Sequence, residues 1–124
     1  MAIRKLLERN ALNIAIVITL VIAFLSLASL KGIPLVKVKN SDKFGHFLAY
    51  FTLCMSWLYA LKHHPALQLK KHTIMLLLIG YGIVIEVLQS VLTTYRQGDF
   101  FDFLANTFGV LLAAFVFQKV ARYL

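Results

Sequence analysis

Residues 73–92 read TIMLLLIGYGIVIEVLQSVL, and this stretch decides the fold class. Most of its twenty residues are apolar or small, and Glu86 is the one charged residue among them. Twenty helical residues rise about 30 Å, which matches the hydrocarbon thickness of a bilayer. A carboxyl group inside such a helix has to be neutral, paired or in contact with water. The stretch therefore predicts a transmembrane helix that carries a functionally important acid.

Three further apolar stretches surround it, at about residues 11–30, 44–61 and 100–118. The whole chain is 60% hydrophobic with a mean hydropathy of +0.80, which is typical of a membrane protein. Its 124 residues leave room for four spans and short connections. We therefore predict an all-α membrane bundle of four transmembrane helices, with residues 1–124 forming a single domain.

The net charge of +8 comes mainly from Lys and Arg residues that lie between the apolar stretches. There they are expected to anchor the chain to anionic headgroups, and no nucleic-acid motif accompanies them. Eight of the thirteen Lys and Arg residues fall on the side that would hold both termini. The positive-inside rule then predicts cytoplasmic termini. Trp57 is expected in an interfacial aromatic belt, and the only cysteine, Cys54, in the packed interior.

The stretch 11–30 has no ionisable residue and is expected to shield the other three helices from lipid. Its basic start also permits a cleaved signal peptide, but the apolar region is longer than such peptides usually have, so we favour retention.

Polar residues form one stripe on each of the other three helices. In an alternating bundle, the start of 44–61, the end of 73–92 and the start of 100–118 lie at the same membrane face. The three stripes should therefore converge there. We predict catalytic roles for His46, Glu86 and Asp102, and substrate-binding roles for Lys43, Tyr50, Gln89, Arg96, Asp99 and Asn106.

Most of these residues also have a purely structural interpretation. Glu86 could simply pair with Arg96 or His46, and Asp42 could cap its helix or orient the His46 imidazole four residues later. Lys43 could be an interfacial lysine, and Asp99 could cap its helix. Gln89 and Asn106 could form helix-to-helix hydrogen bonds.

A metal site is a further alternative, since His46, Glu86, Asp99 and Asp102 offer imidazole and carboxylate ligands. Their spacing matches no compact metal motif, so we predict no metal and no cofactor. Ala105, Gly109 and Ala113 form a run of small residues that should let another helix approach closely below the polar cluster.

The ordered set Ser41-Asp42-Lys43, His46-Phe47, Tyr50, Glu86, Gln89, Arg96, Asp99, Asp102, Asn106 and Gly109 resembles the VanZ-like family of small bacterial membrane proteins. The resemblance covers residues 41 to about 113. It implies a multi-pass protein of the bacterial inner membrane that is connected with the cell envelope. Longer family members are associated with low-level resistance to the glycopeptide teicoplanin.

Three function classes follow. An enzyme would use His46 with Glu86 or Asp102 to exchange protons with a lipid-linked or cell-envelope substrate, held by Arg96 and Lys43. A lipid-binding or accessory protein would hold a headgroup in the same place without chemistry. A proton-coupled transporter is less favoured, because the polar set stops partway across the membrane.

Overall fold

The computed structural model describes residues 2–27, 41–92 and 100–124, without the side chains of residues 41 and 42. Its elements in chain order are α1 (Ala2–Arg9), α2 (Ala11–Leu27), α3 (Ser41–His63), the 3-10 turn η1 (Pro65–Leu67), α4 (Lys71–Leu92), α5 (Phe100–Val120) and the 3-10 turn η2 (Ala121–Tyr123). The described part of the chain contains no strand, so the all-α prediction is confirmed.

Three helices, α3, α4 and α5, are long and apolar enough to cross a membrane. The number rises to four if α1 and α2, which meet at an angle of 61°, are taken as one bent span. The predicted spans 44–61, 73–92 and 100–118 fall within α3, α4 and α5. The predicted span 11–30 corresponds to α2 as far as Leu27, and its last three residues lie outside the described ranges.

Helix α1 was not predicted; it is a short helix whose apolar and charged residues lie on opposite faces. Asn10 separates it from α2, because its side-chain amide donates to the Leu6 carbonyl at 2.9 Å while its own carbonyl accepts from the Ile14 amide. These bonds satisfy backbone groups at a helix end and a helix start. An amphipathic helix bent away from a membrane span is typical of a segment that lies along the membrane interface.

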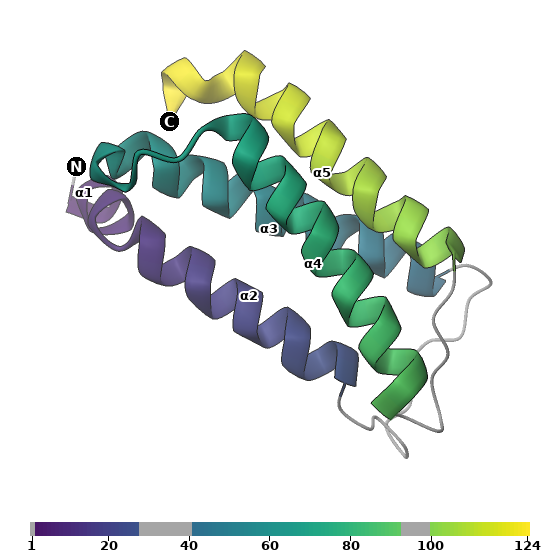
Figure 1. Ribbon diagram of the computed structural model, residues 1–124. Helices are drawn as coiled ribbons and strands as arrows, with labels where there is room; N and C mark the ends of the chain where they lie inside the picture. The colour runs from purple at the N-terminus through teal and green to yellow at the C-terminus, as the bar shows by residue number, and fades with distance from the viewer. Residues whose placement is uncertain (1, 28–40, 93–99) are drawn as a thin grey trace.

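Helix α3 occupies the centre of the bundle and contacts α1, α2, α4 and α5 (Figure 1). Helix α2 packs on α3 and α4, and among the described residues it makes no contact with α5. The expectation that the first span shields all three other helices is therefore wrong for α5. The start of α3, the end of α4 and the start of α5 lie at one end of the bundle, as predicted, and both termini lie at the other end (Figure 1).

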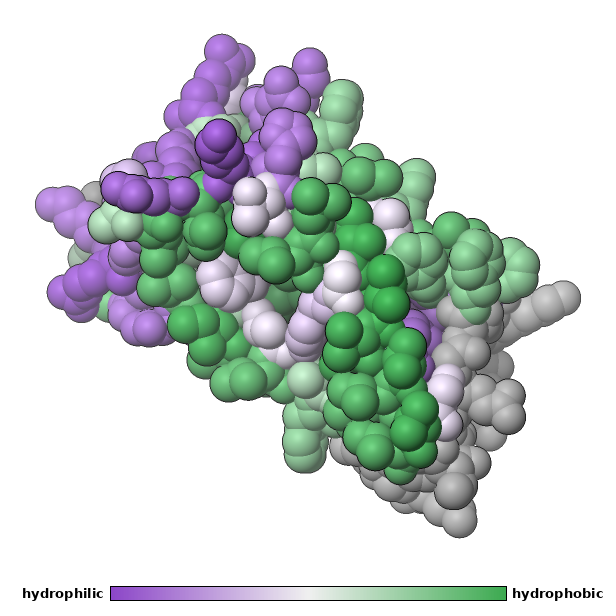
Figure 2. Space-filling view, viewed as in Figure 1, coloured by the Kyte–Doolittle hydropathy of each residue, from purple (hydrophilic) through white to green (hydrophobic). Residues whose placement is uncertain are grey.

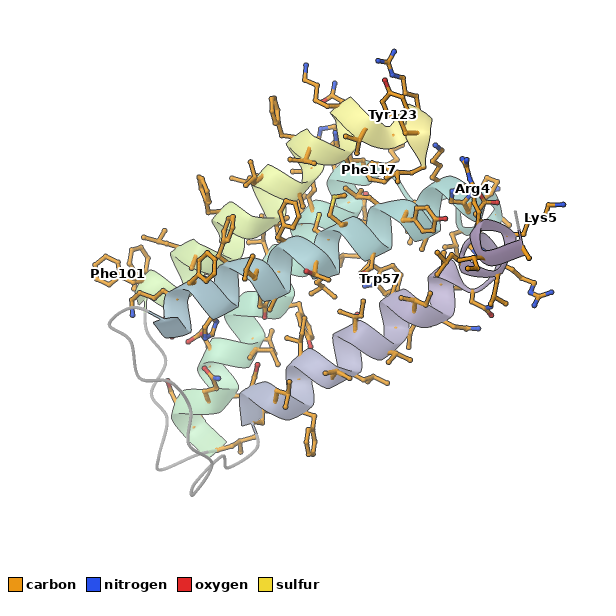
Figure 3. All side chains as sticks on the ribbon, turned by 180° about the vertical axis from the view of Figure 1, so that it is seen from behind. Arg4, Lys5, Trp57, Phe101, Phe117 and Tyr123 are labelled. Atoms are coloured by element: carbon orange, nitrogen blue, oxygen red, sulfur yellow. The ribbon has the colours of Figure 1, made fainter. Side chains whose placement is uncertain are left out.

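Hydrogen bonds hold α2 in place at mid-bundle. The Trp57 indole donates to the Thr19 hydroxyl at 2.9 Å, and the Tyr81 hydroxyl donates to the Thr19 carbonyl at 2.6 Å. Trp57 thus lies between α3 and α2 (Figure 3), and its expected place in an interfacial belt stays a prediction. A polar group inside an apolar bundle is stabilised by such a partner on a neighbouring helix.

The α3–α5 crossing depends on Gly109. A Cβ atom built on Gly109 would lie 2.5 Å from the Phe47 carbonyl oxygen and 3.0 Å from the Phe51 amide nitrogen. Both neighbours are backbone atoms, so only a residue without a side chain permits this approach. Ala113, one turn further on, is fully buried. The predicted close approach at the run of small residues is confirmed at these two positions.

Away from the polar stripes the interior is apolar. It contains Leu53, Cys54, Leu58, Ile74, Leu78, Val110, Ala113, Ala114 and Phe117. Cys54 is a free buried thiol, as expected. Apolar side chains also cover the sides of the helices, and hydrophilic ones gather at the end that holds the termini (Figure 2). This distribution suits a bundle whose middle contacts lipid.

Candidate functional site

Three helices bring polar side chains together at the end opposite the termini. Their residues are Lys43, His46 and Tyr50 from the start of α3, Glu86 from the second half of α4, and Asp102 and Asn106 from the start of α5. The spacing of these residues within α3 and α5 places them on the inner helix faces. We call this set the polar cluster.

His46 lies at the centre of the polar cluster. Its Nδ1 atom is 3.0 Å from Asn106 Oδ1 and 3.8 Å from Glu86 Oε1, and its Nε2 atom is 3.7 Å from Asp102 Oδ2. The amide oxygen of Asn106 can only accept, so the Nδ1–H group donates to it. Asn106 therefore fixes the orientation of the imidazole ring and leaves Nε2 directed towards Asp102.

Asp102 is placed between two basic groups. Its Oδ1 atom lies 3.6 Å from Lys43 Nζ, on the side opposite the His46 contact. It also lies in the first turn of α5, where the helix dipole favours a negative charge. The side chains of Glu86 and Asp102 are only 9% and 11% exposed. Buried carboxylates need such compensation, and the basic groups supply it.

Two hydrogen-bond donors in the polar cluster are buried without a partner among the described residues. They are the Tyr50 hydroxyl and the Asn106 Nδ2 amide, and each residue is only 2% exposed. Nearly all buried polar atoms in proteins have a partner, so such groups commonly bind water or a ligand. These donors make the cluster suited to an acceptor oxygen.

Gly82 of α4 makes room for these donors, and its role was not recognised from the sequence. A Cβ atom there would lie 3.3 Å from Asn106 Nδ2 and 3.3 Å from Tyr50 Cε2. A glycine on the polar stripe of its helix is the sequence signal that could have indicated this role.

Gln89, predicted to bind substrate, connects two helices in the structure, and its substrate-binding role stays a prediction. Its amide nitrogen donates to the Ser26 carbonyl of α2 at 2.8 Å, and the residue is 3% exposed. This contact is the helix-to-helix bond that was the structural alternative for Gln89.

Two predicted binding residues, Arg96 and Asp99, lie outside the described residues, as does the side chain of Asp42. Among the described residues, His46, Glu86 and Asp102 come close enough to hold a metal ion, with one ligand atom from each within 4.8 Å of the others. Imidazole and carboxylate donors suit several divalent cations. The prediction that no metal binds remains a prediction.

The fold and this cluster define a class: a small helical membrane protein with a histidine between two buried carboxylates. The VanZ/LLP1 family model matches residues 3–122, so the chain belongs to the VanZ/LLP1 family. An uncharacterized protein of Schizosaccharomyces pombe is 36% identical over 109 residues, which cover 86% of this chain and 62% of the yeast protein. The family is therefore not restricted to bacteria. No solved structure matches the chain.

Proposed function

We propose that the polar cluster is an acid–base site embedded in the membrane, and that it acts on a lipid or lipid-linked substrate. One observation carries this proposal: the His46 ring lies between Glu86 and Asp102, with Nδ1 3.8 Å from one carboxylate and Nε2 3.7 Å from the other. An imidazole beside a carboxylate is the usual arrangement for taking up and releasing protons at neutral pH.

In this mechanism the Nδ1–H bond to Asn106 holds the ring, and Nε2 carries the proton to or from the substrate. Asp102 stabilises the charged imidazole, and Glu86 balances the charge on the opposite side. The Tyr50 hydroxyl and the Asn106 amide donate to oxygen atoms of the substrate. Lys43, and in the sequence-based prediction Arg96, hold its anionic group.

A second candidate is a lipid-binding or accessory protein that holds a headgroup without chemistry. The two buried donors favour it as much as they favour an enzyme, since binding alone would give them a partner. Transport has less support. Beyond the polar cluster the described core contains apolar residues such as Leu53, Val110 and Phe117 and no buried charged side chain, so a proton path across the membrane lacks acids and bases there.

The substrate class follows from the chemistry and from the family. A yeast relative favours a substrate that bacterial and fungal membranes share, and glycerophospholipids meet this condition. A link to the bacterial envelope and to glycopeptide resistance is a separate prediction from the family resemblance. Teicoplanin susceptibility of a bacterial strain with and without the chain tests it.

We also propose that both termini are cytoplasmic and that the polar cluster opens on the opposite side of a bacterial inner membrane. The support is the excess of Lys and Arg residues on the terminal side, eight of thirteen. Reporter fusions at Leu124 test the orientation, and a fusion active only outside the cytoplasm would reverse it.

Mass spectrometry of lipids that co-purify with the protein tests the main proposal. The wild-type chain and His46→Ala are purified from the same cells. Catalysis predicts that the lipid bound to His46→Ala differs chemically from the lipid bound to wild type, because substrate accumulates. The same lipid in both would favour binding without chemistry and overturn the enzyme proposal.

A further inference from the structure

An apolar groove lies on the outer face of the bundle where α3 and α5 meet. It has a volume of about 640 Å³, and its walls include Phe44 and Phe47 of α3 and Leu104, Phe108 and Leu111 of α5. The Phe47 and Phe108 rings lie 5.6 Å apart between their centroids and form its aromatic centre. From Leu104 to Leu111 the groove extends about 10 Å along the membrane-spanning helix.

The groove adjoins the polar cluster through Lys43. This lysine lines the groove, and its Nζ atom is 3.6 Å from Asp102 Oδ1 inside the cluster. Thr107 also lines the groove, and its buried hydroxyl has no hydrogen-bond partner among the described residues. The groove therefore combines a long apolar surface with one cationic side chain at the end where the site lies.

We propose that this groove seats an acyl chain of a lipid with an anionic phosphate headgroup, and that Lys43 contacts the phosphate. The inference rests on the proposed function and names its substrate class. The groove belongs to helices long enough to span a membrane, so acyl chains surround it. Among the described residues, its one charged lining residue is Lys43, whose ammonium group attracts phosphate. A partner helix seated there would instead enclose the lysine in hydrocarbon, at a high energetic cost.

Photo-crosslinking of the full chain in phosphatidylcholine vesicles tests the inference. The probe is phosphatidic acid with a diazirine in its acyl chain, and the comparison probe is phosphatidylcholine with the same chain. We expect the anionic probe to label the peptide around Leu104 and Phe108 about fivefold more than the comparison probe, the effect of one lysine near an anionic lipid. Lys43→Gln should remove this preference.

A second variant tests the groove itself. Ala105→Leu fills its floor and should reduce labelling there, whereas Val84→Leu, at a 55% exposed position on α4, should not. If Ala105→Leu does not fold, Leu104→Trp at a 43% exposed position fills the same space. Equal labelling by both probes, or labelling no stronger than at Val84, would mean ordinary surrounding lipid and overturn the inference. Crosslinking to a second protein would also overturn it.

The crosslinking and the mass spectrometry of co-purified lipids together separate this inference from the proposed function. If the groove is not labelled while wild type and His46→Ala still bind chemically different lipids, the groove inference alone fails. If the groove is labelled and both proteins bind the same lipid, the acid–base proposal fails and the lipid-seating role stands.

Discussion

The two ends of the bundle both carry histidines, but they use them differently. At the end that holds the termini, His64 donates to the Glu8 carbonyl at 3.1 Å. Lys62 donates to the Ala121 carbonyl at the same end. At the other end, His46 lies between two carboxylates and an amide oxygen.

This difference shows that the partner of a histidine, more than its burial, indicates its role. His64 and His46 are both partly buried. A ring nitrogen that donates to a backbone carbonyl connects chain segments, because the carbonyl cannot exchange a proton with it. A ring nitrogen that faces a carboxylate can exchange its proton. The terminal end is therefore interpreted as structural and the polar cluster as functional.

The largest expected effect concerns His46. His46→Gln should lower turnover of the lipid substrate by about 10²–10⁴-fold, the usual contribution of a general acid or base. His64→Gln is the matched control and should leave turnover unchanged, since His64 binds a carbonyl at the other end. The measurement is lipid turnover by mass spectrometry on reconstituted protein. Equal losses in both variants would remove the distinction between the two ends.

Glu86→Gln is expected to lower turnover by about 10²-fold, at the lower end of that range, because Glu86 acts on the charge of His46. The isosteric amide should keep the fold, with little change in melting temperature in detergent. If Glu86 has only a structural role, the opposite result is expected. The fraction of Glu86→Gln protein that folds should have unchanged turnover, and the broken buried pair should cost about 3–5 kcal/mol of stability.

Gly109→Ala should destabilise the site end by about 1–3 kcal/mol, because the new Cβ atom collides with backbone that cannot move independently. Gly80→Ala and Gly45→Ala are matched controls, since a Cβ atom at either position meets nothing within 4 Å. Both should be neutral or stabilising by up to about 1 kcal/mol. Thermal melting by circular dichroism measures the difference. A Gly109→Ala melting curve like those of the controls would contradict the close α3–α5 crossing.

Trp57→Phe removes the indole hydrogen bond to Thr19 at mid-bundle, away from both ends. Interhelical hydrogen bonds in membranes are worth about 0.6 kcal/mol on average, so the melting temperature should fall slightly. Turnover should not change. A large loss of activity would mean that the position of α2 controls the polar cluster.

The smallest expected effect concerns metal. Chelator treatment should change neither melting temperature nor turnover, and elemental analysis should find no stoichiometric divalent cation. The reason is that His46 Nδ1 is already bound to Asn106. The carboxylate near Nδ1 is Glu86, whereas Nε2 faces Asp102, so the two carboxylates lie at different ring nitrogens. A cation that co-purifies in equal amounts and is lost in His46→Ala would contradict this expectation and make the polar cluster a metal site.

The sequence by itself determined the spans α3, α4 and α5 and the convergence of His46, Glu86 and Asp102. Apolar runs of about twenty residues fix where helices cross a membrane, since each backbone polar group must find a partner within its own helix. Helix periodicity and alternating direction then put His46, Glu86 and Asp102 at one end and one depth. The bounds of α3, α4 and α5 and the close approach of these three side chains agree with that reasoning.

Only the tertiary structure decided which helices and side chains contact one another. Periodicity gives the inner face of a helix but not its neighbour, so Gln89 and Trp57 were placed by α2, which packs on α3 and α4 and not on α5. The bend between α1 and α2 lies at Asn10, whose side-chain amide donates to the Leu6 carbonyl. The groove beside Lys43 is formed by residues of both α3 and α5, which lie far apart in the sequence. Such contacts depend on packing between distant segments, which no local pattern of residues records.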